Sequence, residues 1–519
     1  MGLGACPIDV HLLRGIVALT ALAFAGQAQE PCRVCHPREV AAFESSPMGR
    51  SIGAPAVEAT GRFYHKASDS TIVVRRHGSD IEHRVARHGV SASYPIAYSL
   101  GAGMVGYAYL VRIRDYLFQS PISFYTRTNT WDVAPGNEPK KLLDFTRQIS
   151  SGCLFCHTGS VRLVAGRTNQ FENPPFTAIS CERCHGPSRR HLAKPVPGSI
   201  VNPAKLPQHE RDNVCEQCHL AGAVRILNPG RDWWDYTPGD RLEKVFATYV
   251  EDAGSARLRA VSHYEQLAQS RCARESGGRM WCGTCHDPHG DKPNRPAQVR
   301  QACLSCHEPL FAAGKHAPAT ACVTCHMPSL APADVAHSAI TDHRIVRKPE
   351  PDRSPARVRT ALRAWREPDS TMALRNLGIA YFDWAAREPD PDKLRRAYQL
   401  LSQLPPGARD PGVLVDLASV LLEQGDHRLA VQLFTQAAQA EPENARYAYC
   451  LGVAHERTGD FSAAIEELKR SIRLDPSQMD AYVELSRTYQ AVGRPAQSQE
   501  AIRQYLLFMP QNLTLRSVD

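Results

Sequence analysis

The chain has 519 residues, which is enough for two or three domains. Hydrophobic residues make up 43% of the sequence, an ordinary fraction for a globular protein. The net charge is +8, but no dense run of lysine and arginine occurs, so nucleic acid is not expected as a partner. Seventeen cysteines are many for this length, and their meaning depends on the compartment in which the chain works.

The N-terminus has the pattern of an export signal. A segment that includes His11 and Arg14 precedes an apolar run at residues 15–26, and a small-x-small cleavage pattern ends at Ala28. A short transmembrane anchor is the alternative, but the run is shorter than the ~20 residues that a spanning helix needs. We therefore assign residues 1–29 to a signal peptide and expect a periplasmic or extracellular protein. No transmembrane segment is expected after removal of this leader.

Residues 30–347 form the next region, and strand signals occur near its start. Residues 71–76 and 81–85 flank a Gly-Ser-Asp turn, which predicts a hairpin. Residues 107–113 and 116–125 predict a second strand pair. We expect a small β insert here, with short helices and loops in the rest of the region.

The C-terminal part of the chain contains an internal repeat. A segment rich in proline and charge, residues 348–369, predicts a linker before it. Residues 370–519 then repeat with a period of 34 residues, after an imperfect first copy that begins near Leu374. The landmarks of the repeat are Gly425, Gly459, Gly493, Pro442, Pro476 and Pro510. This pattern resembles the tetratricopeptide repeat (TPR), which implies an all-α solenoid of stacked helix pairs.

A Cys-x-x-Cys-His motif occurs seven times within residues 30–347. The motifs are Cys32/Cys35/His36, Cys153/Cys156/His157, Cys181/Cys184/His185, Cys215/Cys218/His219, Cys282/Cys285/His286, Cys303/Cys306/His307 and Cys322/Cys325/His326. Two thiols three positions apart reach the two vinyl groups of one haem, and the next histidine meets the iron. Zinc or dithiol sites are the alternative, but zinc does not require a histidine after every second cysteine. The motifs predict seven covalently bound haem c groups, which would also supply core volume.

Two further cysteines remain outside the leader and the motifs. Cys450 lies in the first helix of a repeat, where a buried core thiol is expected. Cys272 precedes the Cys282 motif and is either a core thiol, which we favour, or part of a site.

Each iron has a second axial position, and spare histidines are numerous enough to fill it at every haem. Eleven histidines in residues 30–347 lie outside the motifs, namely His65, His77, His83, His88, His191, His209, His263, His289, His316, His337 and His343. Iron with two histidine ligands has no open position and suits electron transfer, whereas iron with one suits catalysis or small-molecule binding.

Segments around the motifs resemble the cytochrome c554-type family and its fusions to TPRs. These segments are residues 32–40, 46–51, 179–187, 282–289, 322–328 and 341–345. The resemblance implies a compact cluster with closely stacked haem pairs. It also ranks the distal ligands, with His289, His191 and His343 first, followed by His316, His337, His263 and His65. Met48 stands where related cytochromes often have histidine and is either a ligand of the first iron or a core methionine.

The expected fold class is mainly α. It comprises a haem-packed cytochrome domain with few regular elements and a small β insert, followed by an all-α TPR solenoid. The expected function is exported electron transfer, with redox proteins as partners and the repeats as a docking module. The alternative is a multihaem oxidoreductase that acts on a small nitrogen or sulfur compound at a five-coordinate haem. A redox-sensing or gas-sensing binding protein is a third possibility. No catalytic residue is assigned, and no Cys-x-x-Cys-Lys site of the nitrite reductase kind occurs.

Overall fold

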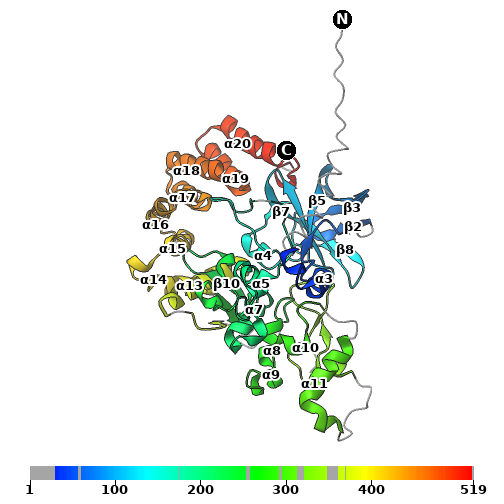
Figure 1. Ribbon diagram of the computed structural model, residues 1–519. Coiled ribbons are helices and arrows are strands. Elements are labelled where there is room, and N and C mark those ends of the chain that lie inside the picture. Colours follow the sequence, from blue (N-terminus) through cyan, green and yellow to red (C-terminus); the bar gives the residue numbers. More distant parts are fainter. Residues whose placement is uncertain are drawn as a thin grey trace.

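The computed structural model describes residues 30–56, 60–172, 174, 176–252, 258–290, 295–312, 321–347, 361–368 and 370–516. The predicted signal peptide, His316 and most of the predicted linker lie outside these residues. A sheet, a region of short helices and a curved row of longer helices make up the described part (Figure 1).

The N-terminal half contains a nine-stranded antiparallel sheet. Its strands are β1 (Ile52–Gly53), β2 (Gly61–His65), β3 (Ser70–His77), β4 (Asp80–Arg87), β5 (Val90–Leu100), β6 (Gly106–Ile113), β7 (Tyr116–Tyr125), β8 (Thr130–Val133) and β9 (Arg147–Gln148). The strands from β2 to β8 neighbour one another in chain order, while β1 pairs with β5 and β9 with β7. Both predicted hairpins are confirmed, as β3–β4 and β6–β7.

The sheet curls until β2, at one end of the strand order, meets β8 at the other end. A Cβ atom on Gly61 in β2 would lie 2.3 Å from Cδ1 of Trp131 in β8, so this approach requires glycine. Ile72, Tyr109 and Phe118 are fully buried in the core of the curled sheet. The prediction of a mainly α cytochrome domain with a small β insert is therefore wrong. Buried residues also alternate with less buried ones along β5, as expected for a strand. The serines, alanines and Pro95 of this strand weaken the apolar pattern in the sequence, which is why the strand was not predicted.

The motif region consists mostly of short helices. They are α2 (Glu30–Arg33), α3 (Pro37–Ser45), α4 (Ser151–Phe155), α5 (Glu182–His185), α6 (Arg189–Ala193), α7 (Gln208–His219), α8 (His263–Gln269), α9 (Arg271–Glu275), α10 (Cys282–Cys285), α11 (Arg295–Ala312) and α12 (Cys322–His326). Two short strands, β12 (Ser329–Leu330) and β13 (Ile340–Thr341), follow them and pair with each other in antiparallel fashion.

A second, three-stranded sheet joins the motif region to the repeats. It consists of β10 (Val224–Leu227), β11 (Phe246–Glu251) and β14 (Leu362–Ala364), all antiparallel. Strand β14 lies within the segment 348–369 that was predicted as a linker, so part of this segment is tied to the motif region by backbone hydrogen bonds.

The repeat region forms antiparallel helix pairs, as the TPR pattern predicts. Its helices are α13 (Ser370–Arg387), α14 (Pro391–Ser402), α15 (Pro411–Gln424), α16 (His427–Ala440), α17 (Ala445–Thr458), α18 (Phe461–Leu474), α19 (Met479–Ala491), α20 (Pro495–Phe508) and α21 (Leu513–Arg516). Gly425 and Gly459 end α15 and α17 in the left-handed conformation that favours glycine. Aspartates then cap the N-termini of the next helices. None of the described helices is long and apolar enough to span a membrane.

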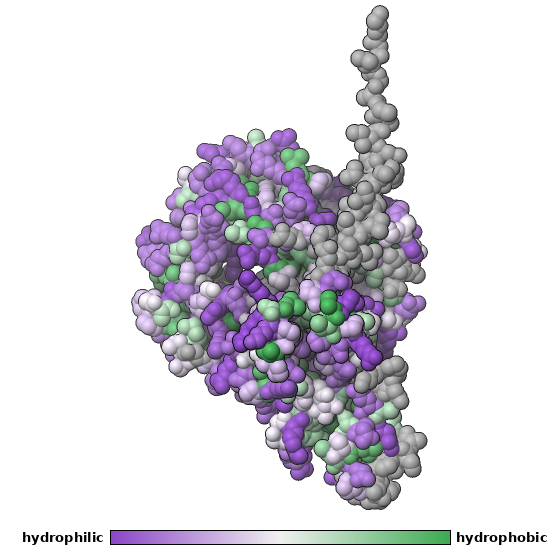
Figure 2. All heavy atoms as spheres, in the orientation of Figure 1, coloured by the Kyte–Doolittle hydropathy of each residue, from purple (hydrophilic) through white to green (hydrophobic). Residues whose placement is uncertain are grey.

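The repeats form an arc that is attached to the rest of the molecule at both ends (Figure 1). At the first end, Tyr381 and Trp384 of α13 share a core with residues of β10 and β11. At the other end, Phe508 of α20 packs against Tyr116 of β7, with ring centroids 5.3 Å apart. Between these ends the surface is hollowed (Figure 2). The repeats are thus an integral part of the molecule and bury apolar residues against it at both ends.

Candidate haem site

All seven Cys-x-x-Cys-His motifs face one continuous cavity of about 3270 Å³. Every motif cysteine and histidine lines it except Cys325. An ordinary small-molecule pocket measures about 300–1,000 Å³, so this space is several times larger than a single-ligand site. The structure therefore brings together attachment sites that span about 290 residues of sequence, and it does so around one shared space.

The backbone of several motifs has the geometry that haem attachment needs. In three motifs a helical hydrogen bond joins the histidine N–H to the carbonyl of the first cysteine, at His36, His185 and His286. This turn places both cysteines on one side and the histidine directly after them. All fourteen motif cysteines are free thiols, so none is sequestered in a disulfide.

The histidines of several motifs are oriented by their Nδ1 atoms. Three such contacts are His157 Nδ1 to Ser51 O at 3.2 Å, His185 Nδ1 to Val201 O at 2.8 Å and His326 Nδ1 to Val346 O at 2.8 Å. A carbonyl oxygen only accepts hydrogen bonds, so each Nδ1 carries the proton and the neutral ring keeps its lone pair on Nε2. Histidine ligands of metals are commonly fixed in this way.

Four motif histidines have a second histidine ring opposite them. The ring-centroid separations are 6.4 Å for His36–His191, 6.0 Å for His185–His289, 6.3 Å for His286–His343 and 5.7 Å for His219–His263. A metal ion between two imidazole nitrogens separates the ring centroids by about 6 Å, since each metal–nitrogen bond is about 2 Å long. The four pairs thus have the spacing of axial ligands on either side of one iron.

The distal rings are also held in the ligand tautomer. His191 Nδ1 lies 2.8 Å from Ser199 Oγ, which itself donates to Val196 O, so the histidine must be the donor in the first contact. His343 Nδ1 donates to Thr341 O at 2.9 Å. These bonds leave the lone pair of each neutral ring on Nε2.

His263 provides an independent test of whether haem fits the cavity. Its Nδ1 atom is buried and has no hydrogen-bond partner, which is costly for a polar atom. Burial, together with the nearby His219 and His343, lowers the pKa of His263 to about 3, so its ring is neutral. Because a neutral imidazole is the form that binds iron, this residue fits an axial role.

Other residues from the sequence prediction lie elsewhere. His65 uses both ring nitrogens, with Nδ1 at 2.8 Å from Ser68 Oγ and Nε2 at 3.0 Å from Glu138 O. His337 is bound to Asp132 at 2.7 Å. Neither of these histidines lines the cavity, whereas Met48 and Cys272 do.

Thiols of different motifs lie near enough to interact, which indicates which attachment sites are neighbours. The interacting pairs are Cys32–Cys181, Cys156–Cys218, Cys215–Cys282 and Cys303–Cys322. The first motif thus adjoins the third, the second adjoins the fourth, the fourth adjoins the fifth and the sixth adjoins the seventh.

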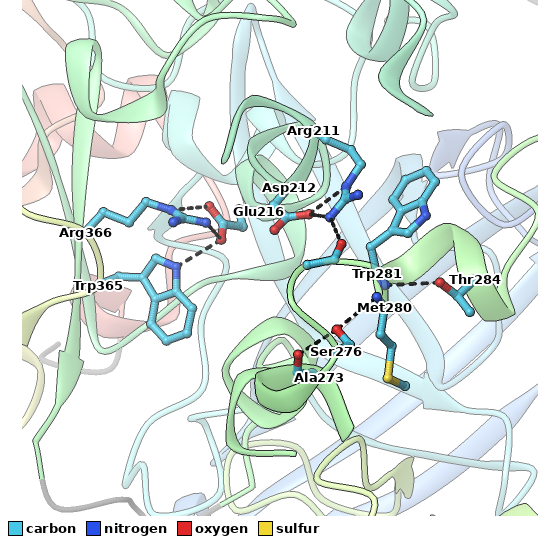
Figure 3. Close-up of polar contacts among 11 residues, drawn as sticks. Arg211, Asp212, Glu216, Ala273, Ser276, Met280, Trp281, Thr284, Trp365 and Arg366 are labelled. Carbon is cyan, nitrogen blue, oxygen red and sulfur yellow. Dashed lines mark hydrogen bonds and ion pairs between the residues drawn. The ribbon is translucent and has the colours of Figure 1, made fainter. Parts of the chain in front are cut away.

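Buried charges surround the fourth motif, and sequence reasoning did not single them out (Figure 3). Glu216, between Cys215 and Cys218, is 1% exposed in its side chain and accepts hydrogen bonds from Arg366 and from Trp365 Nε1. Burial raises the pKa of Glu216, and Arg366 opposes that rise. The segment that leads into the repeats is therefore bonded directly to a haem-attachment motif.

Taken together, the motifs, the shared cavity and the arc of helical repeats define a cytochrome that carries protein-interaction repeats. Residues 126–186 match the family model of cytochrome c554 and c-prime, and residues 415–478 match that of the tetratricopeptide repeat. The chain thus combines a cytochrome c554 domain with C-terminal TPRs, as the sequence resemblance predicted, and the family implies haem c.

Other similarities concern the repeats. Small glutamine-rich tetratricopeptide repeat-containing protein 2 of Saccharomyces cerevisiae is 29% identical over 89 residues, or 17% of this chain. The match spans only 26% of that relative's length. A crystal structure of MamA is 18% identical, covers 28% of this chain and 81% of MamA, and has a TM-score of 0.24. A structure of MamA from Desulfovibrio magneticus RS-1 is also 18% identical, with coverages of 27% and 86% and a TM-score of 0.22.

Proposed function

We propose that this protein is an exported electron-transfer cytochrome that binds seven haem c groups covalently in one cluster. The observation that carries the proposal is that all seven motifs face the same cavity. When bound, haem c supplies reversible one-electron exchange at its iron. The chain's own residues attach it through paired thiols, orient it through histidines and exclude water with the surrounding shell.

Four of the axial ligand sets follow from the ring separations. His36 with His191, His185 with His289, His286 with His343 and His219 with His263 would hold one iron each. Two imidazole ligands keep the iron geometry nearly constant on reduction, which favours rapid electron transfer.

The thiol interactions support a continuous route through the first five attachment sites. They link the first motif to the third and the fourth motif to both the second and the fifth. His289, which follows the fifth motif, lies opposite His185 of the third motif and joins these groups. Attachment sites that share contacts in this way would keep neighbouring haems close enough for electrons to pass between them.

A specific observation favours a second function, catalysis at an open iron. Among the described residues, no second histidine ring lies opposite His157 at the spacing seen in the four pairs. The haem attached at Cys153 and Cys156 would then have an open position for a small nitrogen or sulfur compound. The sixth motif shares this feature among the described residues, since no second histidine ring lies opposite His307 there, so the second and sixth motifs are the places to search for a catalytic haem.

The export and docking parts of the proposal rest on the ends of the chain. The leader pattern at residues 1–29 supports delivery to the periplasm or the exterior, where c-type haem is attached. The exposed surface of the repeat arc supports docking of a redox partner protein, since TPR stacks present extended binding surfaces.

Two measurements on the protein from a host with haem maturation test the proposal. The denatured mass should exceed that of the polypeptide by seven haems, since thioether bonds survive denaturation. Electron paramagnetic resonance of the oxidised protein should show mostly low-spin iron. A mass without covalent haem would contradict the proposal, and a high-spin signal that responds to nitrite, hydroxylamine or sulfite would favour the enzyme.

A further inference from the structure

Arg183 lies buried where three motifs meet. It stands between Cys181 and Cys184, and its residue is 7% exposed. Its Nη2 donates to the carbonyl of Phe155 in the second motif at 3.1 Å, and its guanidinium lies 4.2 Å above the Phe155 ring. Its own carbonyl accepts from Gln217 in the fourth motif at 2.9 Å. Residues inside the second, third and fourth motifs are thus interlocked around one positive charge.

A second guanidinium, that of Arg225, lies close to the second and fourth motifs. Arg225 of β10 donates to the carbonyls of Gln217 and Leu220 at the C-terminal end of α7. Its Nη1 also lies 3.8 Å from Sγ of Cys156. Both Arg183 and Arg225 line the haem cavity.

Neither of these two cations is paired with a carboxylate side chain of the described residues. In the described part of the chain, no carboxylate lies within ion-pair distance of Arg183 or Arg225, and Nε of Arg183 is buried without any partner. The neighbouring charges behave differently, since Arg211 pairs with Asp212 at 3.1 Å and Arg366 with Glu216 at 2.7 Å. The cavity lining here therefore carries two positive charges that no described side-chain carboxylate offsets.

We propose that Arg183 and Arg225 raise the reduction potentials of the haems at the second and fourth motifs relative to their values without these charges. The inference rests on the proposed function. Reduction adds one negative charge to a haem, and a buried cation stabilises that state because the surroundings screen it weakly. The two cations would make the centre of the cluster the place where electrons gather.

The test is a spectroscopic redox titration of the holoprotein with neutral replacements at each cation. A unit charge that acts across about 10 Å of protein changes a reduction equilibrium by about tenfold, which is about 59 mV for one electron. Arg183→Gln and Arg225→Gln should each move the potentials of one or two haems downward by about this amount. Arg183→Lys keeps the charge and should leave them near the wild-type values. Arg189→Gln removes an exposed arginine of α6 and is the matched control.

Haem content, measured on the same samples, separates this inference from the proposed function. Wild-type protein without covalent haem would refute the function itself. Full haem content with potentials that move no more in Arg183→Gln and Arg225→Gln than in Arg189→Gln would overturn the inference. If Arg183→Gln fails to load haem, the redox titration of Arg225→Gln alone tests the inference. Arg225 lies near the same haem-attachment motifs but belongs to a separate element, β10.

Discussion

Removing a distal histidine should convert one haem, and only one, to the high-spin state. His289 is the most direct choice, because its ring lies 6.0 Å from that of His185 and nearly parallel to it, at 12°. His289→Ala leaves the two cysteines and the proximal histidine of the third motif in place, so haem attachment should be unaffected. The ferric iron at that motif would then bind water or nothing on its distal side, which favours the high-spin state.

The expected magnitude follows from the number of motifs. One of seven irons should change, so the high-spin signal should integrate to about one seventh of the total haem. Electron paramagnetic resonance of the oxidised protein measures this fraction, and the denatured mass verifies that all haems remain. His191→Ala and His343→Ala should each give the same result at a different haem, because their rings face other motif histidines.

His65→Ala and His337→Ala are the matched controls. The sequence ranked both histidines as ligands, but His65 bonds Ser68 and Glu138 and His337 bonds Asp132, outside the cavity. Neither replacement should alter the spin-state spectrum. The reasoning from ring separations would be refuted if His289→Ala kept every haem low-spin, or if His65→Ala produced the high-spin signal instead.

The remaining predictions concern stability. Burial raises the pKa of Asp416 to about 8, so its carboxyl keeps a proton that the unfolded chain releases near pH 4, and stability should fall as pH rises between these values. Asp416→Asn should remove this fall, which amounts to at most about 1.4 kcal/mol per pH unit. Gly61→Val should destabilise the holoprotein by about 1–3 kcal/mol, since its Cβ would collide with Trp131. Asp144→Ala should speed amide exchange in α21, because Asp144 accepts three hydrogen bonds from Leu513 and Thr514.

Each of these outcomes has a clear contrary result. Denaturation at pH 5, 7 and 8 that gave Asp416→Asn and the wild type parallel stabilities would show that Asp416 is ionised in the native state. Gly53→Val is the control for Gly61→Val, because a Cβ at Gly53 in β1 meets no atom within 4 Å. Equal destabilisation by the two replacements would mean that the approach of β2 to β8 is not tight. Unchanged exchange in α21 after Asp144→Ala would mean that apolar packing alone holds this helix.

Local patterns in the sequence predicted the elements whose period is strong. The repeat helices and the β3–β4 and β6–β7 hairpins are confirmed because their apolar positions recur at regular intervals. The size of the sheet was missed because β5 carries many small and polar residues. Strand β14 could not be foreseen from its own three residues, since it exists only through pairing with β11, more than 100 positions earlier.

The candidate site, like the fold, was predictable from the sequence only in part. The motifs are visible in the sequence because haem attachment fixes the spacing of adjacent residues. Distal ligands come from segments that are remote in the sequence. The spacing of residues along the chain does not reveal where in the fold such a histidine lies. His263 was ranked low but lines the cavity, while His337, ranked above it, lies beside Asp132. Arg183 passed unnoticed because its importance depends on Phe155 and Gln217, which belong to other motifs.

The bond between Glu216 and Arg366 has a consequence for the order in which the protein is assembled. Glu216 lies inside the fourth motif, and its partner follows the last motif by about 40 residues, so the contact can close only after all seven motifs have been synthesised. Assembly should therefore proceed with haem attachment along the emerging chain first and docking of the repeat arc last, so that the arc seals a cluster that is already loaded.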